Sequence, residues 1–307
     1  MDNQTKKAAW IAVDWGTTNL RVWMMGRDNV LFGQAHSDKG MGGLTTDEFE
    51  PALMELIAPY LADDQVTPVI CAGMVGAREG WREANYIATP CPPPCRTAAV
   101  KVEAEDPRIS VTILPGIKQI TPPDVMRGEE TQIAGFLREY PNFDGIICLP
   151  GTHTKWVHIS AGEIVSFQTF MTGEMFALLS EQSVLRHSVA SDEWDQNSYL
   201  AAISDAMTRP QSVAAHLFGL RAGGLVGELA AETARARLSG LLIGIELAAA
   251  RPYWLGQNVA IIGAGAVAEL YRSALVEQGV PAVVRDVADL TLAGLTAAFT
   301  AQEGVSK

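Results

Sequence analysis

The sequence predicts an α/β protein of two related domains, and three observations support this prediction. The chain has 307 residues, which is long for one hydrophobic core and suits two domains. Short apolar runs alternate with stretches of helical periodicity. Residues 11–23 and 146–157 each combine an apolar run, a glycine–threonine turn and a second apolar run, which is typical of a strand, a tight turn and a strand.

The two glycine–threonine turns suit an anionic ligand. Glycine allows the backbone to approach an anion because it has no Cβ atom. Threonine hydroxyls add donors, and successive N–H groups in such a turn form an anion-binding concavity. Two of these turns facing each other would hold a polyphosphate from both sides. Nucleotide phosphates are therefore the first candidate ligand.

The first half continues with alternating elements. The sequence predicts a strand over residues 30–35 and a loop over 37–43. A helix over 45–62 and a buried strand over 66–71 follow. Thr45 and Glu48 predict a capping box at the start of the helix. The loop over 72–86 is dense in glycine, aromatic and charged residues, which favours a site for a small polar ligand. A solvated loop in which Trp81 fills the core is the structural alternative.

Another helix is predicted from residue 129, after a proline-rich region with two short strands over 98–102 and 111–114. Its apolar stripe comprises Ile133, Phe136, Leu137 and Tyr140. Glu129 and Glu130 therefore fall in the first turn, where negative charge complements the helix dipole. The functional alternative is that one of them points into a cleft as a base.

The second half has a similar mixture of elements. Strands are expected over 146–149, 154–157, 164–167, 258–262 and 281–285. Helices are expected to begin at residue 171, to occupy most of 192–250, to follow the 258–262 strand up to residue 277, and to end the chain. The turn Gly263–Ala264–Gly265 also fits a dinucleotide-binding pattern, with Asp286 placed to meet a ribose, so a NAD-dependent dehydrogenase is the alternative function. Against it, few residues follow Asp286, and the glycine–threonine turns would have no role. The same turn could instead lie beneath an adenine.

Composition limits the partners. The net charge of −12 argues against nucleic acid, because phosphate backbones require basic surfaces. Residues 1–7 lack the apolar core of a signal peptide, and the apolar region 238–250 is too short and too charged to cross a bilayer. The four cysteines show no disulfide-framework spacing, which favours reduced thiols and a cytoplasmic protein.

These features together resemble the acetate and sugar kinase/Hsp70/actin superfamily. Five segments resemble its motifs and occur in the expected order. Residues 14–19 and 150–155 resemble the first and second phosphate motifs, and residues 128–130 and 239–250 resemble the first and second connecting segments. Residues 262–266 resemble the adenosine motif. The resemblance implies two ribonuclease H-like (actin-like ATPase) domains with mixed sheets flanked by helices and a central inter-domain cleft. We expect the domains over 1–132 and 133–307, with the last helix packing back on the first domain as an alternative.

Within the superfamily, the sequence is most similar to the 2-dehydro-3-deoxygalactonokinase family. The similarity lies in residues 37–41, 72–76, 80–84, 126–132 and 149–157. It implies phosphorylation of the 6-hydroxyl of 2-dehydro-3-deoxy-D-galactonate by ATP and Mg²⁺, in D-galactonate catabolism. A kinase for another keto-deoxy sugar acid is an alternative, because the sequence does not distinguish the epimers. A non-catalytic nucleotide-dependent regulator is disfavoured, because no basic helix-turn-helix segment is visible. The oligomeric state is left open, with a homodimer as one alternative.

The resemblance also assigns roles to residues. The expected catalytic residues are Asp14, as the Mg²⁺ ligand, and Glu129 or Glu130, as the base. Many sugar kinases of the superfamily have Asp at the base position, so the choice within the pair is open. The expected ATP-binding residues are Asp14, Gly16, Thr17, Thr18, Asn19, Arg21, Gly151, Thr152, His153, Thr154, Lys155, Gly263, Ala264 and Gly265.

The expected substrate-binding residues come from the first half. They are Lys39, Gly40, Met41, Gly73, Met74, Arg78, Trp81 and Tyr86. Lys39, with Arg78 or Arg82, would bind the substrate carboxylate, and Trp81 and Tyr86 would stack on its carbon chain. For His153 a hydrogen-bonded structural role is the alternative, and Arg21 and Lys155 have an alternative as exposed strand residues.

Overall fold

The computed structural model describes residues 6–227 and 229–301, so most of the N-terminal segment that lacks a signal-peptide pattern lies outside the described residues. The chain divides into two compact units. Unit 1 holds the described residues up to Phe143, Ser160–Ser166 and those from Val287, and unit 2 holds Asp144–Ile159 and Phe167–Asp286. This division differs from the expected boundary after residue 132.

Unit 1 is built on a six-stranded mixed sheet of order β3-β2-β1-β4-β7-β6. Strand β2 is antiparallel to β1 and β3, whereas β1, β4 and β7 are parallel. The strands are β1 (Trp10–Trp15), β2 (Leu20–Met25), β3 (Leu31–Ser37), β4 (Thr67–Gly73), β6 (Val100–Lys101) and β7 (Ile109–Ile113). A small sheet of order β5-β8-β9 comprises Tyr86–Ala88, Gly116–Gln119 and Asp124–Met126.

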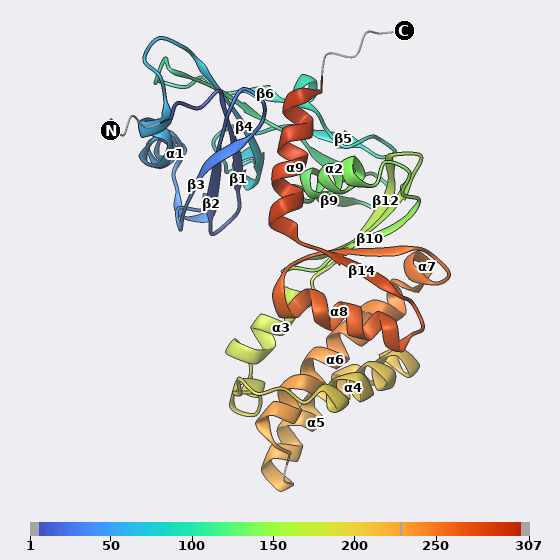
Figure 1. Ribbon diagram of the computed structural model, residues 1–307. Helices are drawn as coiled ribbons and strands as arrows, with labels where there is room; N and C mark the ends of the chain where they lie inside the picture. The colour runs from blue at the N-terminus through green and yellow to red at the C-terminus, as the bar shows by residue number, and fades with distance from the viewer. Residues whose placement is uncertain (1–5, 228, 302–307) are drawn as a thin grey trace. The chain divides into compact units, whose positions relative to one another are not determined.

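Helices cover both faces of the six-stranded sheet. Helix α1 (Phe49–Ile57) buries Phe49 and Leu53 against one face. The Thr45–Glu48 capping box that the sequence predicts is present, at the 3-10 turn that leads into α1. On the other face, α9 (Val287–Thr300) packs Leu295 and Ala298 into the core. Helix α2 (Glu129–Glu139) lies beside α9, as Figure 1 shows, and this packing holds all of α2 in unit 1.

Unit 2 repeats the strand order of unit 1. Its five-stranded sheet has the order β12-β11-β10-β13-β14, so both sheets place the third, second, first and fourth strands side by side. The first two strands are antiparallel, and β10, β13 and β14 are parallel. The strands are β10 (Gly145–Leu149), β11 (Thr154–Ser160), β12 (Glu163–Phe170), β13 (Val259–Ile262) and β14 (Ala282–Arg285).

Helices rather than a long loop fill the region between β12 and β13. They are α3 (Thr172–Ala177), α4 (Gln196–Thr208), α5 (Val213–Val226), α6 (Ala231–Ala249) and α7 (Arg251–Trp254), and α8 (Gly265–Glu277) joins β13 to β14. Buried residues of α4, α6 and α8 form one core with β10, β11 and β13. The prediction of an α/β protein with two related mixed-sheet domains is therefore confirmed.

Two glycines set the distance between α2 and α9. A Cβ atom at Gly135 would collide with the backbone oxygen of Leu290, and one at Gly294 would collide with that of Thr131. The helices therefore approach each other more closely than any residue with a side chain would permit.

We expect Gly294→Ala to lower the free energy of unfolding by about 1–3 kcal/mol, because the new methyl group overpacks the α2–α9 contact. Gly219→Ala is the matched control, since Gly219 lies in α5 and a Cβ atom there would meet no other atom within 4 Å. That variant should gain about 0.5–1 kcal/mol from helix propensity. Urea unfolding measures both, and equal stability of the two variants would contradict the packing argument.

Candidate active site

Asp14 lies at the carboxyl end of β1, where three segments of unit 1 meet. Its neighbour on the parallel strand β4 is Ala72, and a Cβ atom on the following residue, Gly73, would lie 3.4 Å from Asp14 Oδ1. A Cβ atom on Gly128, at the start of α2, would lie 3.5 Å from Gly73 Cα. Glycine at 73, with φ of +92°, therefore lets β4 and α2 approach the carboxylate.

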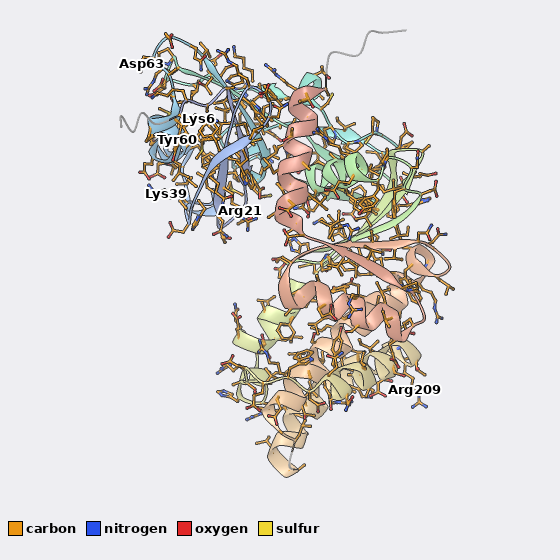
Figure 2. All side chains as sticks on the ribbon, viewed as in Figure 1. Lys6, Arg21, Lys39, Tyr60, Asp63 and Arg209 are labelled. Atoms are coloured by element: carbon orange, nitrogen blue, oxygen red, sulfur yellow. The ribbon has the colours of Figure 1, made fainter. Side chains whose placement is uncertain are left out.

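The charges around Asp14 oppose one another. Loss of water raises the pKa of its carboxyl group, the Arg21 guanidinium lowers it, and the negative charge of Glu129 raises it further. The closest approach to Arg21 is 3.7 Å, from Nη1 to Asp14 Oδ2. Figure 2 shows Arg21 and Lys39 at the same end of the β2–β3 pair. Asp14 and Glu129 are thus close enough to influence each other.

The two glutamates of α2 have different surroundings. Glu130 is fully buried, and its two carboxylate oxygens accept the Gly128 N–H at 2.9 and 2.7 Å. Burial, and then the charge of Glu129, raise the pKa of Glu130 to about 8. Glu129 is partly exposed and accepts the Arg127 N–H at 3.0 Å. Of the pair, only Glu129 is partly exposed.

The first glycine–threonine turn is supported by the loop that follows β3. The N–H of Met41 donates to Gly16 O at 3.0 Å, and that of Gly42 donates to Thr17 O at 2.9 Å. A Cβ atom at Gly40 would collide with the backbone of Thr17 and Thr18, so this loop requires glycine there. The support leaves the side chains of Thr17, Thr18 and Asn19 exposed.

The second turn is supported in the same way by the segment that follows β12. The N–H of Glu174 donates to Thr152 O at 2.9 Å, and a Cβ atom at Gly173 would collide with Gly151 O. His153 Nε2 lies 2.6 Å from Glu174 Oε2, which agrees with the structural alternative for this histidine. Gly151 and Thr152 remain exposed.

Several residues expected at the surface of a ligand site lie elsewhere. Thr154 and Lys155 are buried, and the Thr154 hydroxyl is hydrogen-bonded to the Tyr271 hydroxyl at 2.9 Å. They follow the turn rather than form it, because β11 begins at Thr154 and both residues are part of this strand. Gly263, Ala264 and Gly265 join β13 to α8, directly before two residues that line a pocket, Ala266 and Val267.

The substrate-binding candidates of unit 1 differ in their surroundings. Trp81 is buried against the rings of Phe49 and Trp15, which is the structural alternative for this residue, and it cannot stack on a substrate from there. Lys39 Nζ is ion-paired with Glu55 at 2.6 Å. Arg78 is exposed, whereas Gly73 ends β4 close to Asp14 and Met74 follows it.

Arg127 was not among the expected site residues. Its Nη2 donates to Ala84 O at 2.7 Å, and its guanidinium lies 4.3 Å from the centre of the Tyr86 ring. The buried Arg127 therefore packs against the partly exposed Tyr86 ring and fastens the 84–86 segment beside Gly128. The sequence signal was present, since Arg127 directly precedes the Gly128–Glu130 segment.

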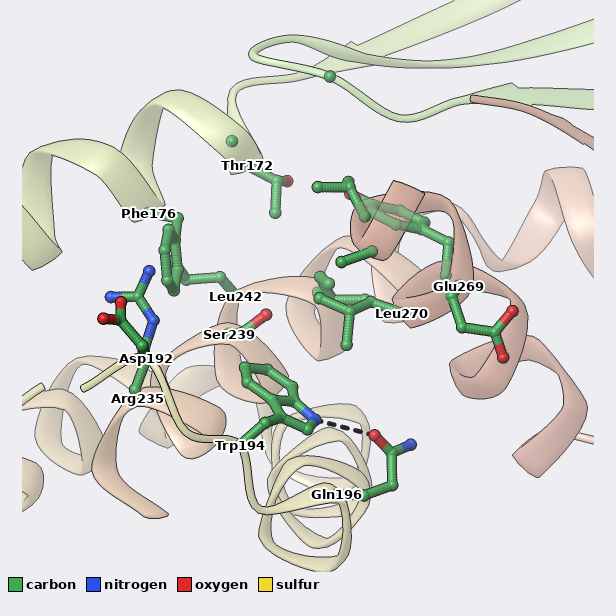
Figure 3. Close-up of a pocket in the computed structure, with 16 residues that line it drawn as sticks. Thr172, Phe176, Asp192, Trp194, Gln196, Arg235, Ser239, Leu242, Glu269 and Leu270 are labelled. Atoms are coloured by element: carbon green, nitrogen blue, oxygen red, sulfur yellow. Dashed lines mark hydrogen bonds between the residues drawn. The ribbon is translucent and has the colours of Figure 1, made fainter. Parts of the chain in front are cut away.

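Unit 2 contains a pocket of about 490 Å³, which Figure 3 shows in close-up. Gly151, Thr172 and Gly173 line one part of it, beside the second glycine–threonine turn. The remaining lining residues are Phe176, Asp192, Trp194, Gln196, Arg235, Ser239, Leu242, Ile243, Ala266, Val267, Glu269, Leu270 and Tyr271. Its volume is in the range of small-molecule sites, and its aromatic and aliphatic walls with a few polar groups suit a nucleoside.

Most of the pocket residues were missed from the sequence. Ser239, Leu242 and Ile243 lie within the segment that resembles the second connecting helix, so that resemblance could have identified them. Trp194 and Gln196 have no such signal, because they reach the pocket through the fold of the 178–196 segment. The Trp194 indole N–H donates to Gln196 Oε1 at 2.9 Å.

The two sheets share one strand order, and each has a supported glycine–threonine turn between its first two strands. The chain matches the 2-keto-3-deoxy-galactonokinase family over residues 14–298, and it belongs to that family. This membership gives no support to the alternative of a dehydrogenase.

Similar proteins cover nearly the whole chain. A Rhizobium meliloti (strain 1021) protein named "probable 2-dehydro-3-deoxygalactonokinase" is 38% identical and matches 97% of this chain and 98% of its own. The 2-dehydro-3-deoxygalactonokinase of Escherichia coli (strain K12) is 33% identical, over 92% of this chain and 94% of its own. A Sinorhizobium meliloti crystal structure provisionally named for the same activity has a TM-score of 0.88 at 37% identity and covers 94% of this chain and 97% of its own.

Two further observations concern the described residues alone. Within residues 6–227 and 229–301, no three His, Cys, Asp or Glu side chains converge as a metal cluster. None of the described helices combines the length and the apolar character needed to cross a membrane.

The raised pKa of Glu130 predicts a pH-dependent stability. Between pH values near 4.5 and about 8, folded Glu130 keeps a proton that the unfolded chain releases, so the free energy of unfolding falls as pH rises. Glu130→Gln removes this dependence, because glutamine resembles the neutral acid. The free energy of unfolding of the variant, relative to that of the wild type, should therefore rise by a few kcal/mol between acidic and alkaline pH. Urea unfolding across this range measures it, with Glu139→Gln, an exposed residue in the last turn of α2, as the control. Parallel curves for Glu130→Gln and the wild type would contradict the assignment.

Proposed function

We propose that the protein is an ATP-dependent kinase that phosphorylates the 6-hydroxyl of 2-dehydro-3-deoxy-D-galactonate. Membership of the 2-keto-3-deoxy-galactonokinase family and the names of the relatives support this activity. The structural observation that carries the proposal is the unit 2 pocket, because a nucleoside-sized space adjoins a glycine–threonine turn. We place the reaction in the cytoplasm, where ATP is supplied.

Each unit has its own candidate groups for the nucleotide. In unit 2 the adenosine lies against Leu242, Leu270 and Val267, with Ala266 small enough to permit close contact. Phosphate oxygens accept hydrogen bonds from the exposed turn at Gly151 and Thr152. In unit 1 the candidate phosphate donors are the exposed hydroxyls of Thr17 and Thr18.

Asp14 fits the role of a Mg²⁺ ligand. A hard cation prefers carboxylate oxygen and commonly takes one or two protein carboxylates, with phosphate oxygens and water as its other ligands. A single carboxylate at the end of β1 therefore suffices, and no protein cluster is required. When bound, Mg²⁺ neutralises charge on the transferred phosphoryl group.

Glu129 is the proposed base. It is partly exposed and near Asp14, whereas Glu130 has no surface through which to meet a substrate. The sugar 6-hydroxyl oxygen attacks the γ-phosphorus, the bond from that phosphorus to the ADP oxygen breaks, and the hydroxyl proton passes to the Glu129 carboxylate. Glu130 instead holds the Gly128 N–H and fixes the start of α2.

The substrate carboxylate is assigned to Arg78 or Arg82. Both side chains are exposed in the loop that leads from β4, whereas the Lys39 ammonium is ion-paired with Glu55. The backbone of Gly73 and Met74 completes this side of the proposed site. Trp81 acts behind the surface by packing against Phe49, whereas the partly exposed Tyr86 packs against Arg127.

The activity is tested with purified protein, ATP, Mg²⁺ and a panel of keto-deoxy hexonates and pentonates. ADP release, followed by a coupled assay, should require the sugar acid and should be fastest with 2-dehydro-3-deoxy-D-galactonate. A higher kcat/KM for another panel member would reassign the substrate. ATP binding without turnover of any member would contradict a kinase and favour a nucleotide-dependent regulator.

The choice of base is tested by a pair of variants. Glu129→Gln should lower kcat by about 10²–10⁴-fold, the usual contribution of a positioned base, with little change in the KM for ATP. Glu130→Gln is the matched control on the next residue and should keep most of the activity. The reverse order of kcat values would make Glu130 the base, and small equal losses would mean that both residues only cap α2.

A further inference from the structure

Unit 2 buries a carboxylate that has no role in the proposed reaction. Glu246 lies in α6 and is only 1% exposed. Its Oε1 accepts the Trp156 indole N–H at 2.8 Å, and its Oε2 accepts the Tyr271 hydroxyl at 2.8 Å and the Thr172 hydroxyl. The three donors come from β11, α8 and the first residue of α3, so one side chain of α6 joins three other elements.

The Glu246 carboxylate does not line the pocket, but two of its hydrogen-bond partners do. Thr172 and Tyr271, whose hydroxyls it accepts, both line the pocket. Thr172 directly precedes Gly173, which supports the second glycine–threonine turn at Gly151. The Tyr271 hydroxyl is also bonded to Thr154, the residue with which β11 leaves that turn. The carboxylate therefore links the phosphate side of the pocket to the helix on its adenosine side.

Stability alone is a poor reason for this arrangement. Burial raises the pKa of Glu246 to about 7, and the hydrogen bonds from Thr172, Trp156 and Tyr271 oppose that shift. Replacing buried charged groups by packed apolar residues is often neutral or stabilising in proteins. A fully hydrogen-bonded buried network does, however, fix the relative positions of the elements that it joins.

We propose that Glu246 is a positioning residue for the nucleotide, which sets the distance between the second glycine–threonine turn and α8 through Thr172 and Tyr271. The proposal rests on the proposed function, since it assigns the pocket to ATP. Glu246 touches neither the pocket nor the reacting atoms, and it acts through the two residues that line the pocket. Its loss therefore affects nucleotide binding and leaves the sugar acid unaffected.

Glu246→Gln is the main test because it keeps the size of the side chain and reverses a donor–acceptor pair. An indole N–H can only donate, so the glutamine carbonyl must face Trp156 and its NH₂ group must face Thr172 and Tyr271. Those hydroxyls must then turn to accept. We expect the KM for ATP to rise about tenfold, equivalent to about 1.4 kcal/mol, with the KM for the sugar acid unchanged.

Threonine variants provide a matched pair. Thr172→Val removes one hydroxyl from the network and keeps the shape of the side chain, so it should raise the KM for ATP in the same direction. Thr67→Val is the control, because Thr67 is a buried threonine of β4 whose hydroxyl has no hydrogen-bond partner among the described residues. Its KM for ATP should equal that of the wild type. Tyr271→Phe tests the second contact and serves if Glu246→Gln fails to fold.

Calorimetric titration with a non-hydrolysable ATP analogue separates the two proposals. If the wild type binds the analogue and Glu246→Gln and Thr172→Val bind it more weakly, the positioning role is supported. If the wild type binds the analogue and the folded variants bind it equally well, the role of Glu246 is overturned and the kinase proposal stays intact. This holds even where the variants have a lower melting temperature. Absence of binding by the wild type overturns both.

Discussion

Close contact between a glycine and a glycine–threonine turn is the constraint on which both units depend. Gly40 lies against Thr17 and Thr18, and Gly173 lies against Gly151, at distances that leave no room for a Cβ atom. In each unit the contact follows the third strand of the sheet and is completed by backbone hydrogen bonds. The backbone therefore supports each turn on one side, while Thr17, Thr18, Gly151 and Thr152 stay exposed. A rigid turn has less conformational entropy to lose when an anion binds.

The two copies of one fold have acquired different surroundings. The turn of unit 1 lies beside the carboxylates of Asp14 and Glu129, whereas the turn of unit 2 adjoins a pocket built from helices α3, α4, α6 and α8. Phosphoryl transfer requires positioning and charge neutralisation more than covalent participation of the protein. A division into acidic chemistry in one unit and nucleotide binding in the other suits that requirement. The network around Glu246 would then maintain the geometry of the nucleotide side.

The sequence predicted the fold because its signals are local. Apolar runs, the Thr45–Glu48 capping box and the two repeated turns each act over a few neighbouring residues, and the structure contains all of them. The site was predicted less completely. The direction of Thr154, the partner of Lys39 and the burial of Trp81 depend on residues distant in sequence, such as Tyr271, Glu55 and Phe49. Trp194 and Gln196 reach the pocket only through helix packing, for which a single sequence has no local signal.

The central claim is that unit 2 binds ATP, with the adenosine in its pocket and the phosphates on its glycine–threonine turn. A crystal structure with a non-hydrolysable ATP analogue and Mg²⁺ tests this claim most directly. The account predicts adenosine against Leu242 and Leu270 and phosphate oxygens on the backbone of Gly151. A nucleotide bound away from the unit 2 pocket, or phosphates that do not contact this turn, would contradict it.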